Sequence, residues 1–336
     1  MTRHHVGPLS TGDALLSHVA DAARLLLLAV PPGRRTPRDL AFSRYLRQVR
    51  RILRSDPSEF EVVESRMLAR GTGTNIVEVT LGTTATVVPG DMLHVLWRNA
   101  SDRIVRHAPH LAAGAYWSTP LPHRPARRLH YSAEEVAASL VDLSHADVPV
   151  SPRRLPRITP RFFTVAGVRQ ESGQTLVRLQ VTRIGTWPER AAAFLHDLRP
   201  GERMQARVLP HPHRVPLDSP GCAIVTGSGA AGVFAALRTG ARGVQLLWGI
   251  GDKVLEPWVR EELDAHLASG ALASLHLAQA PERVTGLLDR IEELPGWIYV
   301  SGNSHMGRDV DVLLSERFGR AELRTREAHL RYIVST

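Results

Sequence analysis

The chain has 336 residues, a length that favours two domains, and its apolar fraction of 43% allows a sizeable core. Its single cysteine, Cys222, excludes a disulfide framework or a cysteine-rich metal site. The formal net charge is +9, and arginine carries almost all of the positive charge, since Lys253 is the only lysine. The sequence has no nucleic-acid motif and no basic tract interleaved with aromatic residues, so this charge does not predict nucleic-acid binding. No apolar run approaches the roughly 20 residues of a membrane-spanning helix and no secretory signal is recognised, so a cytoplasmic protein is expected.

Residues 1–57 are predicted to form a helical N-terminal extension. Apolar side chains recur at helical spacing over 10–30, and Pro31-Pro32-Gly33 ends that helix. Thr36-Pro37 then supplies an N-cap and a first-turn proline for a second helix. The arginines of this second helix are Arg44, Arg47, Arg50, Arg51 and Arg54. They form either a docking face for an acidic electron-transfer partner or a solvated surface.

A β-rich domain is predicted over residues 58–217. Residue alternation predicts strands at 60–69, 76–81 and 85–88, and Pro89-Gly90-Asp91 is a turn that feeds a buried strand. Residues 100–150 are predicted to be a short helical insert, with loops at 107–110 and 120–128 and a capping box at Ser132-Ala-Glu-Glu135 that opens a helix. The histidines of the insert are His107, His110, His123 and His130. They lie on predicted loops without a helical i, i+4 pair, so a metal site is not expected.

The most distinctive stretch of this domain is Leu155-Pro-Arg-Ile-Thr-Pro-Arg161-Phe-Phe-Thr-Val-Ala166. An arginine, two aromatic rings and a hydroxyl group follow the second proline within four positions. Alternation predicts another strand at 176–184 and the last strand of the domain at 204–209. Proline-, glycine- and histidine-rich sequence over 199–220 separates this half from the next, which places the domain boundary near residue 218.

Residues 218–336 alternate predicted strands with predicted helices, which indicates an α/β fold with a doubly wound parallel sheet. The predicted strands are 222–226, 244–248, 273–277, 297–300 and 332–334, and the predicted helices are 230–238, 255–268, 281–293 and 305–318. Gly227-Ser-Gly229-Ala-Ala-Gly232 follows the first strand and opens the first helix. This is the context of a dinucleotide-binding fingerprint, in which glycines let the backbone approach a pyrophosphate at a helix N-terminus.

These motifs, in this order, resemble the ferredoxin–NADP reductase superfamily, in particular the FAD- and NADP-binding half of diflavin reductases. The Arg161 stretch is similar to the family's Arg-x-Tyr-Ser strand in its Pro-Arg-x-x-x-Pro frame, and Pro89-Gly90-Asp91 to its Pro-Gly-Asp strand. Residues 246–263 are similar to the segment Phe-Phe-Gly-Cys-Arg…Tyr-Arg-Glu-Glu-Leu, and 298–310 to Tyr-Val-Cys-Gly-Asp…Met-x-x-Asp-Val. The resemblance covers about residues 60–336 and implies a flavin-binding β-barrel followed by an NAD(P)-binding α/β domain.

The resemblance also implies FAD, and NADP or NAD, as cofactors. Arg161 would hold a phosphate group, while Phe163 and Thr164 would contact the isoalloxazine ring. The other implied site residues are Gly227, Gly229, Gly232, Gly249, Gly302 and Arg283 for the nucleotide, Ser301 (with Thr164) for catalysis, and Tyr332 for shielding the flavin. From the residues alone, Arg283 could equally be a solvated charge and Tyr332 a core tyrosine.

Several positions depart from the family's pattern. On the nucleotide side the departures are Ala230, Ala231, Gly251, Ala280, Ser301 and Asn303, and on the flavin side Glu189 stands where an anion should bind. Two hypotheses therefore remain. The first is an FAD-dependent oxidoreductase that passes electrons from NAD(P)H to a small molecule or to a protein, such as an acidic electron-transfer protein or an oxygenase. The second is a degenerate reductase without hydride transfer, acting as a partner-binding subunit or a non-redox biosynthetic enzyme.

Overall fold

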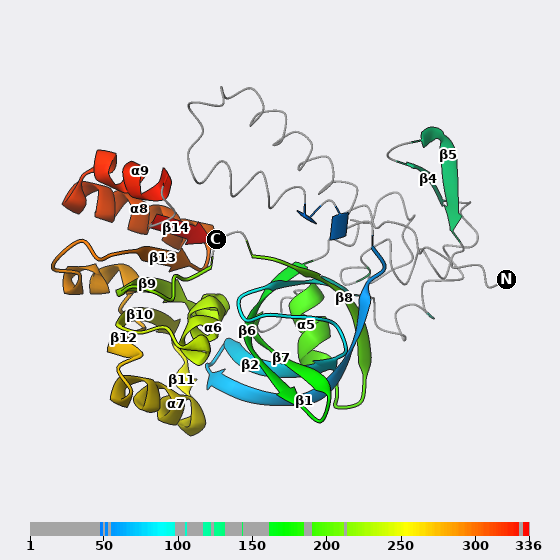
Figure 1. Ribbon diagram of the computed structural model, residues 1–336, viewed down its shortest axis with the longest axis horizontal. Coiled ribbons are helices and arrows are strands. Elements are labelled where there is room, and N and C mark those ends of the chain that lie inside the picture. The colour runs from blue at the N-terminus through cyan, green and yellow to red at the C-terminus, as the bar shows by residue number, and fades with distance from the viewer. Residues whose placement is uncertain are drawn as a thin grey trace.

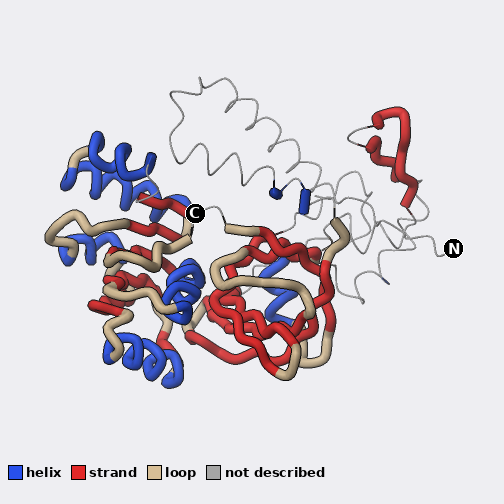
Figure 2. The backbone as a smooth tube through the Cα atoms, viewed as in Figure 1, coloured by secondary structure: helices blue, strands red, loops and turns tan. Residues whose placement is uncertain are grey.

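The computed structural model describes residues 48–49, 51–52, 55–97, 105, 117–121, 124–131, 143, 161–184, 190–211, 214–328 and 332–335 (Figure 1). Within these ranges the chain forms a closed ring of antiparallel strands and a separate parallel sheet flanked by helices (Figure 2). Most of the predicted N-terminal extension and most of the predicted insert, including its capping box, lie outside the described residues.

The ring consists of six strands from the first half of the chain. They are β1 (Ser58–Arg70), β2 (Thr74–Thr83), β3 (Met92–Leu96), β6 (Arg161–Glu171), β7 (Gln174–Ile184) and β8 (Arg203–Leu209). The order β1-β2-β7-β6-β3-β8 is closed by pairing of β8 with β1, for example Met204 opposite Phe60. Alternate side chains such as Val79, Leu81 and Leu179 are fully buried inside the ring, as the period of two predicts.

One predicted strand of this half is a loop. Residues 85–88 were predicted to be a strand from their β-branched side chains, but the next strand along the chain after β2 is β3, which begins at Met92. The Val88 N–H donates to Asp91 Oδ2 (3.0 Å) and Gly90 has φ +80°, so this segment forms the Pro89-Gly90-Asp91 turn and the Val88 N–H is not available for pairing with a strand. Val87 is nevertheless buried, and the turn leads into a buried strand, as predicted.

The second half forms a parallel sheet of five strands. They are β9 (Gly221–Thr226), β10 (Val244–Gly251), β12 (Leu272–Gln279), β13 (Ile298–Ser301) and β14 (Tyr332–Ser335), in the spatial order β12-β10-β9-β13-β14. The chain enters at the central β9 and adds strands outward on both sides, which is the order of a doubly wound sheet. The helices that accompany the sheet are α6 (Ala231–Thr239), α7 (Pro257–Ala268), α8 (Ser304–Phe318) and α9 (Arg320–Ala328). Separate hydrophobic clusters cover the two faces of the sheet.

In this half one predicted helix was wrong and one helix was not predicted. The helix predicted over 281–293 is only a 3-10 segment, η5 (Val284–Arg290). A β-branched pair, Val284-Thr285, followed by Gly286 lowers the helical propensity, while Leu287 and Leu288 still bury their side chains against the sheet. Helix α9 was not predicted, because its sequence is highly charged and carries little apolar periodicity.

Two features outside the ring and the parallel sheet are also described. Strands β4 (Trp117–Leu121) and β5 (Arg124–Tyr131) form a hairpin where a loop was predicted over 120–128. Val49 and Ile52, from the apolar side of the second predicted helix, pack against Leu209 and Met92. Within the described part of the chain, no helix combines the length and apolarity needed to cross a membrane.

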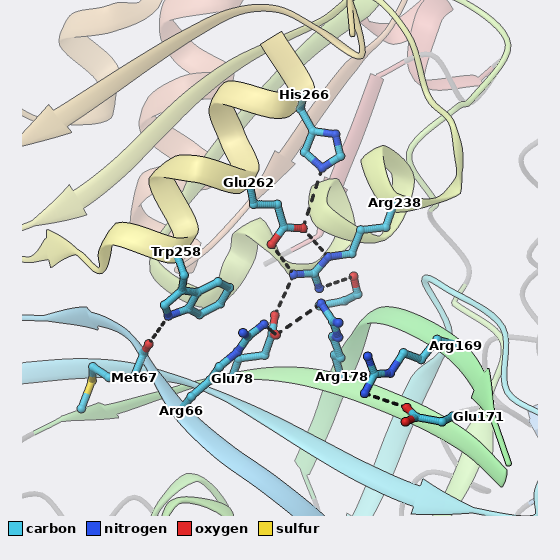
Figure 3. A network of polar contacts seen from close by, with 11 residues as sticks. Arg66, Met67, Glu78, Arg169, Glu171, Arg178, Arg238, Trp258, Glu262 and His266 are labelled. Atoms are coloured by element: carbon cyan, nitrogen blue, oxygen red, sulfur yellow. Dashed lines mark hydrogen bonds and ion pairs between the residues drawn. The ribbon is translucent and has the colours of Figure 1, made fainter. Parts of the chain in front are cut away.

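A buried network of charges joins the ring to the parallel-sheet half (Figure 3). Glu78 of β2 is completely buried, and its carboxylate pairs with Arg66 (2.9 Å) and with Arg238 of α6 (2.9 Å). Arg238 also pairs with Glu262 of α7 (2.6 Å) and donates to the Ala166 carbonyl of β6 (3.1 Å). The network therefore holds α6 and α7 against the outer surface of the ring.

Further bonds strengthen the same junction. The Trp258 indole N–H donates to the Met67 carbonyl (2.9 Å), and the Arg66 guanidinium lies 3.6 Å from the centre of that indole ring. The short strand β11 (Val254–Leu255), which follows β10, pairs with the end of β1 and becomes an edge of the ring's sheet. The chain thus crosses back from the second half to the first.

Candidate functional site

One cleft of about 1180 Å³ lies where the ring meets the carboxyl ends of the parallel strands. The ring contributes the first four residues of β6 and polar side chains of β7, and the sheet contributes the ends of β9, β10 and β13. The carboxyl edge of a doubly wound sheet is where such folds bind ligands, so this cleft is the candidate site.

The ring opens at the cleft because two neighbouring strands separate. β6 pairs with β7 from Val165 onward, whereas residues 161–164 pair with β3 alone. On the other side, β7 continues to Ile184 in register with β2. Arg161, Phe163 and Thr164 of one strand and Gln180 of the other line the resulting opening. Such diverging strands leave backbone hydrogen-bonding groups available to a ligand.

The first turn of a helix also faces this opening. α5 (Arg190–Asp197) covers the ring, and its Leu195 is fully buried among the core side chains of the ring. Ala191 and Ala192, at the N-terminal end of the helix, line the cleft. The N-terminal end of a helix carries partial positive charge and unpaired N–H groups, which favour an anion.

The opposite wall begins with the glycine-rich turn η4 (Gly227–Ala230) between β9 and α6. Gly227 has φ +54°, and its carbonyl accepts a hydrogen bond from the Trp248 indole (3.0 Å). Thr182 of the ring donates its hydroxyl proton to Ser228 Oγ (2.9 Å), and the Ser228 N–H points back to Thr182 Oγ1 (3.3 Å). The turn is therefore fastened to both the sheet and the ring.

The same wall continues at the end of β13, where the chain is closely packed against the glycine-rich turn. A Cβ on Gly229 would lie 2.6 Å from the Ser301 carbonyl oxygen, so only glycine fits. Ser301 itself is 8% exposed. Asn303 immediately precedes α8, and its Oδ1 accepts a hydrogen bond from the Met306 N–H (2.8 Å). Asn303 is thus an N-cap, a role that accounts for an amide at this position.

Nine of the predicted site residues line the cleft: Arg161, Phe163, Thr164, Gly227, Gly229, Gly249, Arg283, Ser301 and Gly302. Gly232 lies instead inside α6, where a Cβ would meet the Tyr299 hydroxyl at 2.6 Å, so its role is packing of helix on sheet. Tyr332 pairs with Ile298 at the amino end of the sheet, whereas Ser335 lies beside Ser301 at the carboxyl end that borders the cleft. The register therefore places the Tyr332 backbone away from the cleft.

Sequence reasoning missed several polar residues of the cleft, namely Gln180, Thr182, Ser228, Lys253, Glu282, His305 and Asp309. Gln180 and Thr182 follow the period of two in β7, so their shared face could have been read from the strand once the cleft was known. Lys253 was noted as the only lysine without being assigned a role. Its place in the cleft depends on the long-range packing of the β10–β11 loop against the ring.

The charges of the cleft are mixed. Among the described lining residues, Arg161, Lys253 and Arg283 are cationic, and Glu282 and Asp309 are anionic. Burial lowers the pKa of Lys253, and the nearby Asp252 carboxylate partly opposes that shift. No group of three or more His, Cys, Asp or Glu side chains in the described part of the chain is placed to bind a metal ion.

Comparison with protein-family models finds no match for this chain, and a search of curated proteins finds no significant match. The function must therefore be argued from the cleft itself.

Proposed function

We propose that the chain is an FAD-dependent oxidoreductase with a ferredoxin reductase-like fold, which takes electrons from NADPH or NADH and passes them to a protein or small-molecule acceptor. The observation that carries this proposal is a single cleft with two different walls. One wall is the Arg161-Phe-Phe-Thr164 edge of the ring, and the other is the Gly227–Ala230 turn with the carboxyl ends of the parallel strands. Two ligands held on facing walls would lie close together, as a reaction between them requires.

The ring wall fits a flavin dinucleotide. Arg161 is exposed at the cleft, and a guanidinium is suited to binding phosphate. Phe163 is partly buried against the ring's core yet lines the cleft, which suits contact with a flat ring. The N-terminal end of α5 adds partial positive charge beside the same opening. These groups together support FAD as the ligand of this wall.

The sheet wall fits a nicotinamide dinucleotide. Its glycine-rich turn precedes α6, and residues of the turn and of the first turn of the helix line the cleft, which is the context that suits a pyrophosphate. Arg283 supplies an exposed cation at the same wall. The nucleotide would therefore lie across the ends of β9 and β10.

The chain's own residues would bind and orient the two ligands. Bound FAD would supply the redox chemistry, accepting a hydride from the nicotinamide and releasing electrons to the acceptor. Thr164 and Ser301 line the two walls, so a ligand that reached their hydroxyl groups would be hydrogen-bonded from both sides. The hydrogen bond between Thr182 and Ser228 joins those two walls.

A second candidate is a reductase-like protein that binds a ligand without hydride transfer, as a partner-binding subunit or a non-redox biosynthetic enzyme. The sheet wall favours it, because Asn303 is engaged as a helix cap and Ser301 is largely covered, with its carbonyl packed against Gly229. Neither residue presents the free acid or thiol that would assist a proton or hydride step.

The experiment is reconstitution of the purified protein with FAD, followed by anaerobic addition of NADPH or NADH. The proposal expects a yellow protein that bleaches with one or both nucleotides. A colourless protein with no affinity for FAD would refute it, and bound flavin that neither nucleotide reduces would support the second candidate instead.

Arg161→Ala tests the flavin wall within this assay. Loss of a charge-assisted bond is worth about 1.5–3 kcal/mol, so we expect the dissociation constant for FAD to rise roughly tenfold to a hundredfold. Arg169→Ala is the matched control, because Arg169 lies on the same strand but is exposed and paired with Glu171 outside the cleft. Equal FAD affinity in both variants would contradict the assignment of Arg161.

A further inference from the structure

The loop after β10 places the only lysine of the chain in the cleft. Lys253 is 8% exposed, although lysine side chains are rarely buried. Its stem packs tightly against the β1–β2 turn, since a Cβ on Gly71 would lie 2.9 Å from Lys253 Cγ. The ammonium group lies beside Gly251, where a Cβ would be 3.6 Å from Nζ. The side chain is therefore confined at the border of the cleft, and its charged end lies near Gly251, which lines the cleft as well.

The backbone around Lys253 is held in place by several bonds. The Lys253 N–H donates to the Ile250 carbonyl (3.3 Å), and the Gln279 amide donates to the Lys253 carbonyl (3.1 Å). Val254, the next residue, pairs with Arg70 of the ring. Lys253 is thus fixed against both the ring and the end of β12, and its position at the cleft is not that of a free surface side chain.

The ammonium group has weak partners within the protein. Nζ donates to the Ile250 carbonyl (3.3 Å), a neutral acceptor. The Asp252 carboxylate lies 3.9 Å away, beyond hydrogen-bonding distance, and its other oxygen already accepts bonds from the Thr72 N–H (2.8 Å) and hydroxyl (2.6 Å). A buried cation whose carboxylate partner is 3.9 Å away and already hydrogen-bonded elsewhere is only partly compensated, so a ligand anion beside it would be stabilised.

A second cation lies on the adjoining loop. The Ala280 N–H donates to the Gly251 carbonyl (2.8 Å), which joins the loop after β12 to the loop that carries Lys253. Three residues further along, Arg283 lines the same cleft. Glu282 also lines it and is the opposing charge on that loop, but it is exposed and forms no ion pair with Lys253 within 4.0 Å.

We propose that Lys253, together with Arg283, forms a phosphate-binding subsite of the cleft. Lysine binds phosphate as a compact point charge, and arginine adds directional donors. The proposal rests on the proposed function for the source of the phosphate, which a nicotinamide nucleotide would supply. The phosphate is either the pyrophosphate that NADH and NADPH share or the 2′-phosphate that NADPH alone carries.

The single lysine makes a direct chemical test possible. Pyridoxal 5′-phosphate carries an aldehyde and a phosphate. Lys253 Nζ attacks the aldehyde carbon, water leaves, and added borohydride delivers a hydride to the resulting imine, which yields a stable secondary amine once a proton is taken from water. Pyridoxal, which lacks the phosphate, is the matched probe, and the α-amino group of the chain is the internal reference. Peptide mass spectrometry measures each site.

We expect the phosphate-bearing probe to modify Lys253 at least about tenfold faster than pyridoxal, which corresponds to about 1.4 kcal/mol, while the α-amino group reacts with both at similar rates. Inorganic pyrophosphate should slow the modification of Lys253. Protection by NADPH but not NADH assigns the 2′-phosphate to the subsite, and equal protection by both assigns the pyrophosphate. Equal rates with the two probes, or no protection by any of these phosphates, would overturn the proposal.

Two sets of variants complete the test. Arg283→Gln should lower the ratio of the two rates at Lys253. Arg290→Gln should leave it unchanged, because Arg290 is exposed at the end of the η5 segment that follows Arg283 and does not line the cleft. Lys253→Met should weaken nucleotide binding measured by fluorescence, and Lys253→Arg should retain it. Unchanged binding by Lys253→Met counts against the subsite.

The two proposals can fail separately. Phosphate-dependent labelling of a protein that never binds flavin would refute the oxidoreductase and keep the subsite. Flavin reduction by a nucleotide, without phosphate-dependent labelling, would refute the subsite alone.

Discussion

Gln180 is an amide buried at the wall of the cleft, 3% exposed. Among the described residues neither its Nε2 nor its Oε1 has a hydrogen-bond partner. An unsatisfied buried amide costs about 1–3 kcal/mol, so the ligand-free protein carries that cost at the junction of its two halves. A ligand or an ordered water molecule would relieve it.

Gln180→Leu removes the unsatisfied amide and keeps the volume of the side chain. We expect the free energy of unfolding of the ligand-free protein to rise by about 1 kcal/mol, measured by urea denaturation. Gln170→Leu is the control, because the Gln170 amide on the neighbouring strand donates to Thr175 Oγ1 (3.1 Å). An equal loss of stability in both variants would show that Gln180 has a partner in solution.

His94 provides a prediction about pH. Burial, with a smaller contribution from the positive charge of Arg207 on the adjacent strand β8, lowers the pKa of His94 from 6.5 to about 4. The unfolded chain therefore binds a proton more readily than the folded protein between these values, so stability falls as the pH drops from about 6.5 to 4. The loss attributable to His94 is on the order of 3 kcal/mol.

His94→Leu should remove that part of the pH dependence. The measurement is the free energy of unfolding of the variant and the wild type at pH 7 and pH 4, since other groups that titrate in this range contribute to both proteins. We expect a smaller drop in the variant. The same drop in both proteins would mean that His94 titrates normally in the fold.

At the scale of elements, the end of β13 and the start of α8 decide the shape of the sheet wall. Gly229 approaches the Ser301 carbonyl, and Asn303 caps α8. Ser301 and Asn303 are two of the positions at which the sequence departs from the reductase pattern it resembles. The structure explains one of them, because Asn303 accepts a hydrogen bond from a backbone N–H that would otherwise be unpaired.

Asn303→Ala should lower the free energy of unfolding by about 1 kcal/mol, because the Met306 N–H loses its acceptor. Asn303→Asp should retain stability, since a carboxylate is an equally good cap and favours the positive end of the helix. Thermal unfolding of the three proteins checks this. If Asn303→Asp were as unstable as Asn303→Ala, capping would not be the role of this residue.

At the scale of the whole molecule, the cleft exists only because the two halves are held together. Glu78 and Arg238 are the central pair of the junction, and both are largely buried (Figure 3). Arg238 links α6, which begins at the glycine-rich turn, to the Ala166 carbonyl of β6, which begins at Arg161. The charge network thus fixes the two walls relative to each other.

Glu78→Gln leaves the surrounding arginines without their shared carboxylate. Breaking a buried ion pair in this way costs about 3–5 kcal/mol, which we expect in denaturant unfolding, and we expect the unfolding transition of the variant to be broader than that of the wild type or split. Glu171→Gln removes an exposed pair with Arg169 and should change stability by less than about 1 kcal/mol. A small effect at Glu78 would show that the two halves are joined mainly by apolar contacts and by β11.

Sequence patterns determined the class of most elements, because periods of two and of about 3.6 residues are local properties of the chain. They predicted the ring strands from Phe60 onward and the alternation of strands and helices after residue 218. The glycine-rich turn was indicated by its place between a strand and a helix, whereas Arg161 and Thr164 were indicated by the resemblance to a known family; all of them line the cleft. The patterns were wrong at 85–88 and 281–293, where a turn and a glycine override the apolar pattern.

Only the tertiary structure decided which of these residues share a cleft. The separation of β6 from β7, the return of β11 to the ring and the burial of Glu78 all depend on contacts between residues far apart in the chain. For the same reason Lys253, a single residue in a loop, could not be assigned from its neighbours in sequence, and only the register showed that the Tyr332 backbone lies at the amino end of the sheet. Local periodicity fixes the face on which a side chain lies, and long-range packing fixes what that face meets.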